Sequence, residues 1–269
     1  MQAGNRVSPA PGTRGEHEVE EAFDRVVSEG KDRLERPLLL LVATGMLGGI
    51  DVGVGVLACL VVDHETGQPL LGAAAFTIGF IALLLARSEL FTENFLVPVT
   101  ARAAGHGSWF QLGRLWLVTL AANLGGGLLM AAMVIGSVPG LRPTAESLGR
   151  HYATLGISWH SLLLAVLAGV VITLMTRMQH ATNDFGPRLV AAVSMSFVLV
   201  GARLFHSVLD SIFMFTGLLA GHASYTWADW AGALCWSVLG NIIGGVGIVT
   251  AIRLLRVPHR LIEERASQD

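Results

Sequence analysis

The sequence predicts an all-α integral membrane protein with six transmembrane helices, arranged as an inverted 3+3 repeat in which helices 2 and 5 are broken. Hydrophobic residues make up 52% of the chain and charged residues 14%, whereas soluble domains carry about 25% charged residues. The charges also gather at the ends: residues 1–36 hold 14 and residues 253–269 hold 7 of the 18 basic and 20 acidic residues. An internal repeat links the two halves of the apolar region between them.

This composition excludes several classes of protein. The mean hydropathy is +0.59, and apolar runs near the ~18-residue length that spans a bilayer follow one another. These features exclude a disordered chain, a nucleic-acid-binding protein and a disulfide scaffold, and they argue against an ordinary soluble enzyme. Residues 1–36 also lack the apolar stretch and cleavage site of a signal peptide. The sequence therefore indicates a multi-pass membrane protein.

The chain divides into three regions. Residues 1–36 form an N-terminal tail. Its first half is rich in Gly, Pro and Ser and is expected to be disordered, and its second half, from about Glu16 to Arg36, is predicted to be a charged helix near the membrane surface. Residues 37–256 form the six-helix transmembrane domain, and residues 257–269 form a C-terminal tail.

Six apolar runs are the predicted spans. They are Leu38–Val62, Leu70–Ala86, Phe110–Val138, Ser161–Thr176, Leu189–Gly201 and Trp230–Leu255. The second and fifth runs continue through polar stretches, Arg87–Val99 and Arg203–Gly221. Backbone groups freed by such an interruption survive at membrane depth only when they are buried in protein or line a wet cavity. We therefore expect a pathway at these two interruptions.

The distribution of Lys and Arg predicts the orientation. The two tails and the connections between spans two and three and spans four and five carry most of these residues, whereas the remaining polar connection carries only Arg142 and Arg150. Basic residues favour the cytoplasmic side, so both termini are predicted to be cytoplasmic, in the inner membrane of a cell. Two arginines, Arg87 and Arg203, are left at membrane depth.

These two arginines begin an internal repeat. Ala-Arg at 86–87 precedes Leu-Phe at 90–91 in the second span, and Ala-Arg at 202–203 precedes Leu-Phe at 204–205 in the fifth. Three spans in each half, an odd number, insert the halves in opposite senses, with the pathway where they meet.

A second pair of matching segments lies in the third and sixth spans. Asn123 and Asn241 are each followed by a Gly-Gly pair within a few residues. Small residues let helices approach closely, so these segments are predicted to serve mainly in helix packing.

Ionisable residues in spans two and five are the candidate pathway residues. Intramembrane charges cost at least about 2.5–3.5 kcal/mol each and seek partners. Arg87, Glu93, Arg203 and Asp210 are therefore expected either to line the pore or to form structural ion pairs, and the sequence leaves this choice open. His206, beside the second break, is predicted to face the pathway, because ionisable groups rarely enter spans for packing alone.

At these residues the sequence resembles the formate/nitrite transporter family, over about residues 35–257. Three segments carry the resemblance, in the expected order: Leu90-Phe91-Thr92 in the broken second helix, Phe205-His206-Ser207-Val208 in the broken fifth helix, and Gly240-Asn241-Ile242-Ile243-Gly244-Gly245 in the sixth. The form Leu-Phe-Thr-Glu-Asn at 90–94 suggests a less-characterised branch of that family.

The resemblance implies an aquaporin-like fold, a homopentamer and one pore per protomer for small monovalent anions. His206 would be the central histidine of the pore and Thr92 the hydroxyl beside it. Leu90 and Phe91 would help to form one constriction, and Leu199 stands where the family carries an aromatic constriction residue. No enzymatic activity, cofactor or metal is implied.

The chain also differs from the well-studied members of that family. Thr173 stands where they carry an asparagine, and Asp210 is another replacement of an asparagine. Arg87, Glu93 and Arg203 stand where they are mostly neutral. Added acids at the centre of a pore repel an anion unless the arginines offset them, so the solute is not fixed by the sequence.

We therefore expect a channel or transporter for a small anion or its conjugate weak acid, with the lipid bilayer and copies of the same chain as its partners and no nucleic acid. A neutral-solute or water channel of the same architecture is the alternative, although the paired Asn-Pro-Ala boxes of aquaporins are absent. A membrane enzyme or scaffold is disfavoured, because no assembled constellation of acid, base and nucleophile is present.

Overall fold

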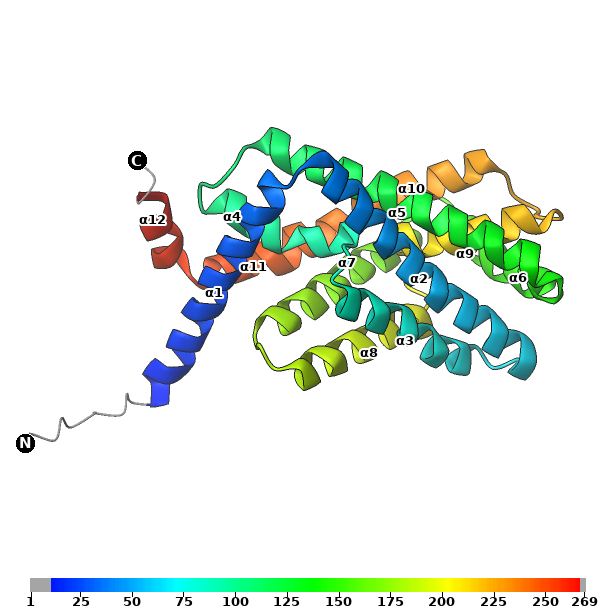
Figure 1. Cartoon of the computed structure of the whole chain (residues 1–269), viewed down its shortest axis with the longest axis horizontal. Helices are drawn as coiled ribbons and strands as arrows, with labels where there is room; N and C mark the ends of the chain where they lie inside the picture. Colours follow the sequence, from blue (N-terminus) through cyan, green and yellow to red (C-terminus); the bar gives the residue numbers. More distant parts are fainter. Residues whose placement is uncertain (1–10, 267–269) are drawn as a thin grey trace, which may run out of the picture.

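The computed structural model describes residues 11–266, which form a bundle of helices (Figure 1). The first half contains α1 (Pro11–Glu35), α2 (Leu38–Thr66), α3 (Pro69–Ala86), the 3₁₀ turn η1 (Phe91–Phe95), α4 (Val97–Ala103) and α5 (Trp109–Ser137). The second half contains η2 (Pro139–Leu141), α6 (Arg142–Ala153), α7 (Trp159–His180), α8 (Phe185–Gly201), α9 (Ser207–Ala220), α10 (Trp227–Ile242), the π-helical η3 (Ile243–Thr250), α11 (Ala251–Leu255) and α12 (Pro258–Ala266).

Five of the described helices are long and apolar enough to cross a membrane. They are α2, α3, α5, α7 and the continuous run Trp227–Leu255. The shorter apolar helices α8 and α9 follow one another where the fifth span is predicted. The prediction of an all-α, multi-pass membrane protein is therefore confirmed, and the predicted apolar runs agree with the helices to within a few residues.

Local signals set the ends of the long helices. Ser108, Ser158 and Thr226 precede α5, α7 and α10, and each hydroxyl oxygen accepts a hydrogen bond from the backbone N–H three residues later. Such N-caps satisfy groups that the first turn of a helix leaves free. At the other end of α2, Gly67 takes a left-handed conformation with φ 63°, which suits glycine because it has no Cβ.

Glycines allow close helix contacts in both halves. A Cβ added to Gly49 of α2 would overlap the carbonyl oxygen of Asn123 in α5, and one added to Gly169 of α7 would overlap that of Asn241 in α10. Any larger residue at either position would push the two helices apart. The glycines beside Asn123 and Asn241 make similar close contacts: a Cβ added to Gly126 would overlap the carbonyl oxygen of Met46, and one added to Gly244 that of Val166, so these segments pack closely as the sequence predicted.

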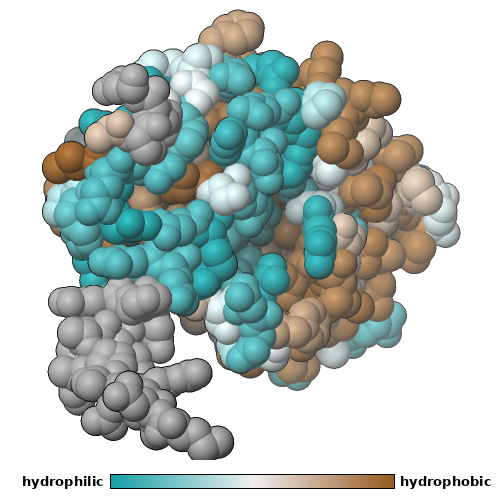
Figure 2. All heavy atoms as spheres, turned by 60° about the vertical axis from the view of Figure 1, so that its left-hand side comes forward, coloured by the Kyte–Doolittle hydropathy of each residue, from teal (hydrophilic) through white to brown (hydrophobic). Residues whose placement is uncertain are grey.

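The helix α1 and the C-terminal α12 lie together at one end of the molecule, opposite α6 (Figure 1). The helix α1 begins at Pro11, earlier than the expected start at Glu16; residues 1–10, on which part of the expected disordered stretch falls, lie outside the described residues. Its apolar face, with Phe23, Val26 and Leu34, is buried and packs on α4. From this end the surface is largely hydrophilic, and hydrophobic side chains cover the flank beside it (Figure 2).

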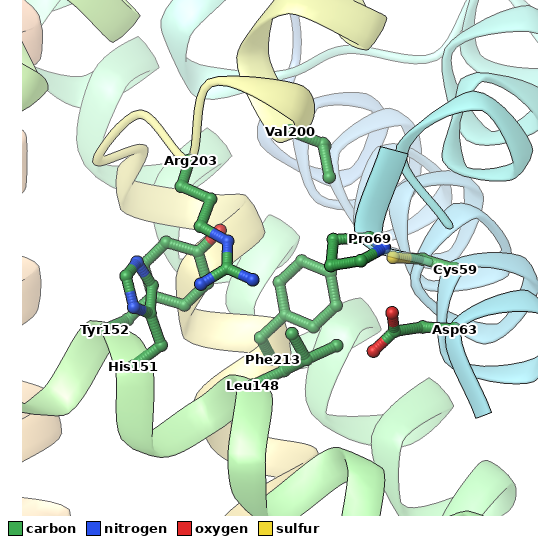
Figure 3. A pocket seen from close by; sticks show the side chains of 9 residues that line it. All are labelled: Cys59, Asp63, Pro69, Leu148, His151, Tyr152, Val200, Arg203 and Phe213. Atoms are coloured by element: carbon green, nitrogen blue, oxygen red, sulfur yellow. The ribbon is translucent and has the colours of Figure 1, made fainter. Parts of the chain in front are cut away.

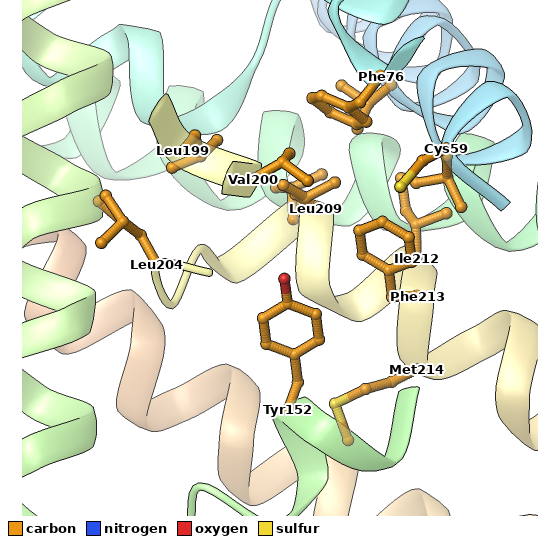
Figure 4. Close-up of a cluster of buried hydrophobic side chains, with 14 of the residues drawn as sticks. Cys59, Phe76, Tyr152, Leu199, Val200, Leu204, Leu209, Ile212, Phe213 and Met214 are labelled. Carbon is orange, nitrogen blue, oxygen red and sulfur yellow. The ribbon is translucent and has the colours of Figure 1, made fainter. Parts of the chain in front are cut away.

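The main apolar core lies among α2, α3, α6, α8 and α9 (Figure 4). Tyr152 of α6 stacks on Phe213 of α9, with ring centroids 5.8 Å apart. Phe76 of α3 and Cys59 of α2 complete the cluster. This core joins elements of the first half to elements of the second and so fixes the two interruptions relative to each other.

Candidate functional site

The first interruption, residues 87–96, lies between α3 and α4. The helix α3 ends where Arg87 takes a left-handed conformation, with φ 53°. The amide of Asn123 on α5 then binds the released backbone: its Oδ1 accepts from the N–H of Phe91 at 2.8 Å, and its Nδ2 donates to the carbonyl of Glu89 at 2.8 Å. The N–H of Glu89 donates to the carbonyl of Thr44 on α2 at 3.2 Å. Buried backbone groups at the break are therefore hydrogen-bonded, as a low-dielectric environment requires.

The second interruption, residues 202–206, lies between α8 and α9 and has the same construction. Arg203 is left-handed, with φ 48°. Asn241 on α10 accepts from the N–H of Ser207 at 3.0 Å through Oδ1 and donates to the carbonyl of Phe205 at 3.0 Å through Nδ2. The N–H of Phe205 donates to the carbonyl of Leu164 on α7 at 3.3 Å.

These hydrogen bonds define which residues of the two breaks correspond. Phe91 and Ser207 occupy the same place, as do Arg87 and Arg203, each four residues earlier. Phe205 instead corresponds to Glu89. The Leu-Phe dipeptides that suggested the repeat are therefore not in equivalent positions, because the asparagine amides bind backbone atoms and do not depend on the side chains at the break.

The side chains of Thr92 and His206 meet between the two breaks. Thr92 Oγ1 lies 2.8 Å from His206 Nε2, and both residues are fully buried. His206 Nδ1 accepts a hydrogen bond from the N–H of Leu209 at 3.1 Å. An imidazole nitrogen that accepts carries no proton, so the neutral ring holds its proton on Nε2 and donates it to the Thr92 hydroxyl.

Two buried carboxyl groups cap the backbone on either side of this contact. Asp210 Oδ2 accepts from the N–H of His206 at 2.7 Å, and Glu93 Oε2 accepts from the N–H of Leu90 at 3.3 Å. Asp210 Oδ1 is buried without a partner among the described residues. Glu93 differs because it lines a cavity that also contains Arg33.

Apolar and hydroxyl side chains surround the contact. Leu90, Phe91, Leu199 and Thr173 are buried, with at most 2% of their surface exposed, and Leu199 lies near the second break (Figure 4). The hydroxyl of Thr173 has no hydrogen-bond partner in the part of the chain that the structure describes. The centre of the molecule is thus apolar, with a few hydroxyl groups aimed into it.

A large cavity opens beside the first break, on the side of the molecule that carries α1. Its volume is ≈ 420 Å³. It is lined by four arginines, three glutamates and several neutral residues, including Arg87 and Glu93 from the break, Glu29, Arg33 and Arg36 from α1, and His180 and Arg188. We call it the inner cavity.

A much smaller cavity of ≈ 20 Å³ lies beside the second break (Figure 3). It is lined by Arg203, Asp63, His151 and Tyr152, among others, and we call it the outer cavity. The pKa of His151 is lowered by burial and, to a smaller extent, by the charge of Arg203. Arg203 is therefore the cation of this cavity near neutral pH.

The structure brings Thr92 and His206 together and places Arg87 and Arg203 apart, one in each cavity. The sequence left open whether the ionisable residues pair with one another. Within residues 11–266, neither arginine makes an ion pair or a side-chain hydrogen bond. The carboxyl groups of Glu93 and Asp210 instead cap backbone N–H groups.

Ion pairs at the first break come from α1, which sequence reasoning did not connect to the site. Arg33 contacts Glu29 at 2.5 Å, Glu89 at 3.5 Å and the Oδ1 of Asn94 at 2.9 Å, and Arg36 also binds Glu89. Burial alone raises the pKa of Glu29, but its hydrogen bond with His180 and the charge of Arg33 lower that pKa well below its usual range.

The roles of Asn123 and Asn241 also went beyond the expectation of helix packing. The glycines beside them pack, but the two amides bind the breaks. An asparagine within an apolar span was the available signal, because a buried amide needs partners for all its polar atoms. Among the described residues, no group of three His, Cys, Asp or Glu side chains is placed to hold a metal ion.

A sequence profile described as "Formate/nitrite transporter" matches residues 20–255. The chain is 27% identical over 246 residues to the "Uncharacterized transporter YrhG" of Bacillus subtilis (strain 168), covering 87% of this chain and 91% of the relative. It is 25% identical over 249 residues to "Formate channel BtFdhC" of Bacillus thuringiensis, covering 87% and 93%.

Solved structures share the fold. An "FNT family ion channel" superimposes with a TM-score of 0.79 at 20% identity, over 90% of this chain and 99% of that one. A "Pentameric formate channel with formate bound" superimposes with a TM-score of 0.68 at 21% identity, over 81% and 97%.

Proposed function

This chain belongs to the formate/nitrite transporter family, and from that premise we propose that it conducts small monovalent anions, or their conjugate weak acids, through one pore in each protomer. It is a membrane channel or transporter and not an enzyme. The observation that carries the proposed pathway is the hydrogen bond between His206 Nε2 and Thr92 Oγ1, because it joins the two interruptions at the buried centre of the molecule.

The proposed architecture has six crossings in an inverted 3+3 repeat, with an aquaporin-like arrangement. Helices α3 and α4 together form the broken second crossing, and α8 and α9 form the broken fifth. The matching hydrogen bonds of Asn123 and Asn241 support this arrangement. Both termini are proposed to be cytoplasmic in an inner membrane, as the Lys and Arg count indicates.

The proposed assembly is a homopentamer. The similar fold of a pentameric formate channel supports it. Large apolar side chains that are at least 79% exposed in the single chain, such as Leu39, Phe110 and Trp159, would be covered by lipid or by neighbouring copies.

The proposed pathway runs from the inner cavity, past Arg87 and Glu93, to the neck formed by Leu90, Phe91 and Leu199. Beyond the neck lie His206, Thr92 and Thr173, and then Asp210 and Arg203 beside the outer cavity. A weak acid crosses an apolar neck far more cheaply as a neutral molecule than as an anion.

His206 supplies a hydrogen-bond donor just beyond the neck. Its Nε2–H points at Thr92, so an anion that displaces the Thr92 hydroxyl receives the same hydrogen bond. The neutral ring keeps this proton, since losing it would leave an imidazolate; when a proton from solution protonates the anion, the solute leaves as a neutral acid. Charged flow and neutral release are then two limits of one pathway, and pH sets the balance between them.

Flux measurements in proteoliposomes test this function. We expect uptake of formate, nitrite or acetate above that of empty liposomes, with a dependence on pH. His206→Ala should lower the rate about tenfold, because a hydrogen bond to a charged group contributes about that factor. Thr92→Val, which keeps the shape and removes the hydroxyl, should lower it less.

The matched control is His160→Ala, since His160 is exposed at the start of α7 and should leave flux unchanged. Wild-type flux no higher than that of empty liposomes would refute the proposal. Relatives named as formate channels do not favour the alternative of a neutral-solute or water channel; swelling in glycerol that is independent of pH and of His206 would revive it.

A further inference from the structure

Arg87 and Arg203 are unusual in their backbone conformation. They are the non-glycine residues with positive φ in the described part of the chain, at 53° and 48°. Five glycines, Gly67 among them, take the other positive-φ positions. A side chain in the left-handed region is strained, and glycine would remove that strain. The chain nevertheless keeps an arginine at both equivalent positions.

The two guanidinium groups face opposite sides of the central contact. Arg87 lines the inner cavity and Arg203 the outer cavity. In Figure 3 the side chain of Arg203 extends toward Tyr152, while Asp63 lies on the far side of Phe213. Each arginine therefore lines the cavity beside its own break.

Within the described residues, neither guanidinium forms an ion pair with a carboxylate. In the inner cavity, Glu29 and Glu89 are bound by Arg33 and Arg36, and Glu93 accepts a hydrogen bond from the N–H of Leu90. In the outer cavity, Asp63 is the carboxylate, and it makes no ion pair with Arg203 in the described structure. Both arginines are exposed in the single chain, and each lines a cavity.

We propose that Arg87 and Arg203 are paired anion-binding sites, one at each mouth of the pore, that take small planar anions with two adjacent oxygens, such as carboxylates. This inference rests on the proposed function and adds a substrate class. A guanidinium presents two parallel N–H donors, which match two oxygens of one anion. An anion with a single binding atom, such as hydrosulfide, receives only one of these bonds.

The left-handed backbone conformation of Arg87 and Arg203 positions their guanidinium groups. It turns the chain out of α3 or α8 at the residue that carries the guanidinium, so the side chain leaves the helix toward the cavity. Strain of this kind is characteristic of binding sites. Exposure to solvent keeps the binding weak, which lets the anion move on toward the neck.

The test uses Arg87→Gly and Arg203→Gly, because glycine fits the left-handed conformation and preserves the fold. Flux is measured separately from each face, in right-side-out and everted membrane vesicles. We expect the half-saturating formate concentration to rise about tenfold from the outer face in Arg203→Gly and from the inner face in Arg87→Gly, since charge-assisted hydrogen bonds contribute about this factor. The maximal rate should change less.

Hydrosulfide and two control variants separate this site from general electrostatic attraction. The half-saturating hydrosulfide concentration should rise by less than that of formate, because hydrosulfide loses the attraction of the charge but only one hydrogen bond. Arg203→Lys should recover only part of the formate affinity. Arg142→Gln and Lys31→Gln, which remove exposed charges elsewhere from the outer and inner faces, should leave it unchanged.

Two results would overturn the inference: unchanged formate half-saturation in both glycine variants, or an equal increase for formate and hydrosulfide. Binding of ¹³C-formate to the detergent-solubilised protein, followed by NMR saturation transfer, keeps this inference separate from the proposed function. If wild-type flux is absent but binding is present and is lost in the double glycine variant, the two sites stand and the transport proposal falls.

Discussion

The two interruptions share one device but differ in what surrounds it. In both, an asparagine amide from a neighbouring helix binds the backbone on each side of the break. The first break is also held by Arg33 and Arg36 of α1, whereas the second receives no ion pair from any described residue. A buried ion pair is costly to break, so the first interruption is fixed to the N-terminal helix.

Because of this difference, the two breaks have separate roles: the first is anchored to α1, and the second carries the imidazole of His206. At the first break Glu89 is bound by the arginines of α1, and Thr92 contributes a hydroxyl. At the second break the carboxyl of Asp210 binds backbone, and His206 presents an N–H donor on Nε2. The two breaks therefore have similar backbone hydrogen bonds but different contents: the first is bound to α1, and the second carries the imidazole.

The largest expected effect tests the ion pairs between α1 and the first break. Arg33→Ala should destabilise the protein by about 3–5 kcal/mol, because it leaves the buried carboxylate of Glu89 with one partner fewer. Thermal unfolding in detergent measures the loss. Arg25→Ala, on the same helix but with a more exposed side chain, is the matched control; equal effects of the two would show that α1 does not hold the first break.

A smaller effect compares the two amides. Asn241→Ala and Asn123→Ala each strand buried backbone groups at a cost of about 1–3 kcal/mol per group. Asn241→Ala should be the more damaging, because the first break keeps the ion pairs of α1 and the hydrogen bond from Trp116 Nε1 to the carbonyl of Asn94. Unfolding temperatures rank the variants, and the reverse order would contradict the proposed anchoring.

Lowering the pH should weaken the contact between α1 and the first break, because it protonates the carboxylate of Glu29. The folded pKa of this carboxyl is lowered, so the stability it contributes is fully present above the ordinary glutamate pKa and is lost as pH falls below it. Hydrogen exchange of α1 should therefore increase between about pH 5 and pH 3, values that bracket that pKa. Glu29→Gln should weaken this dependence, and an unchanged pH profile in that variant would assign it to other groups.

The smallest effect concerns backbone strain, where the two breaks should behave alike. Arg87→Gly and Arg203→Gly each relieve a left-handed residue, but glycine also gains entropy in the unfolded chain. We expect a net stabilisation of about 0.5 kcal/mol in each, measured by thermal unfolding. A clear loss of stability in one variant would reveal a structural role for that guanidinium.

Much of the fold could be read from composition and periodicity. Apolar runs gave the long helices, and polar residues at membrane depth marked both breaks. His206 and Thr92 were singled out, and they lie 2.8 Å apart. The register between the breaks was not readable, because the repeated Leu-Phe pair is a similarity of side chains whereas the correspondence depends on which backbone groups reach Asn123 and Asn241.

The sequence by itself determined which segments are helical, which prefer lipid and where the spans are interrupted, since hydropathy and backbone propensity act over neighbouring residues. Only the tertiary structure decided which residues contact each other. Arg33 of α1 donates a hydrogen bond to Asn94, 61 residues later in the sequence, and Asn123 and Asn241 each bind the backbone of one break. Such contacts depend on how the helices pack against one another, and a pattern of neighbouring residues does not encode that packing. The same packing placed Arg87 and Arg203 in separate cavities, where neither forms an ion pair with a carboxylate of residues 11–266.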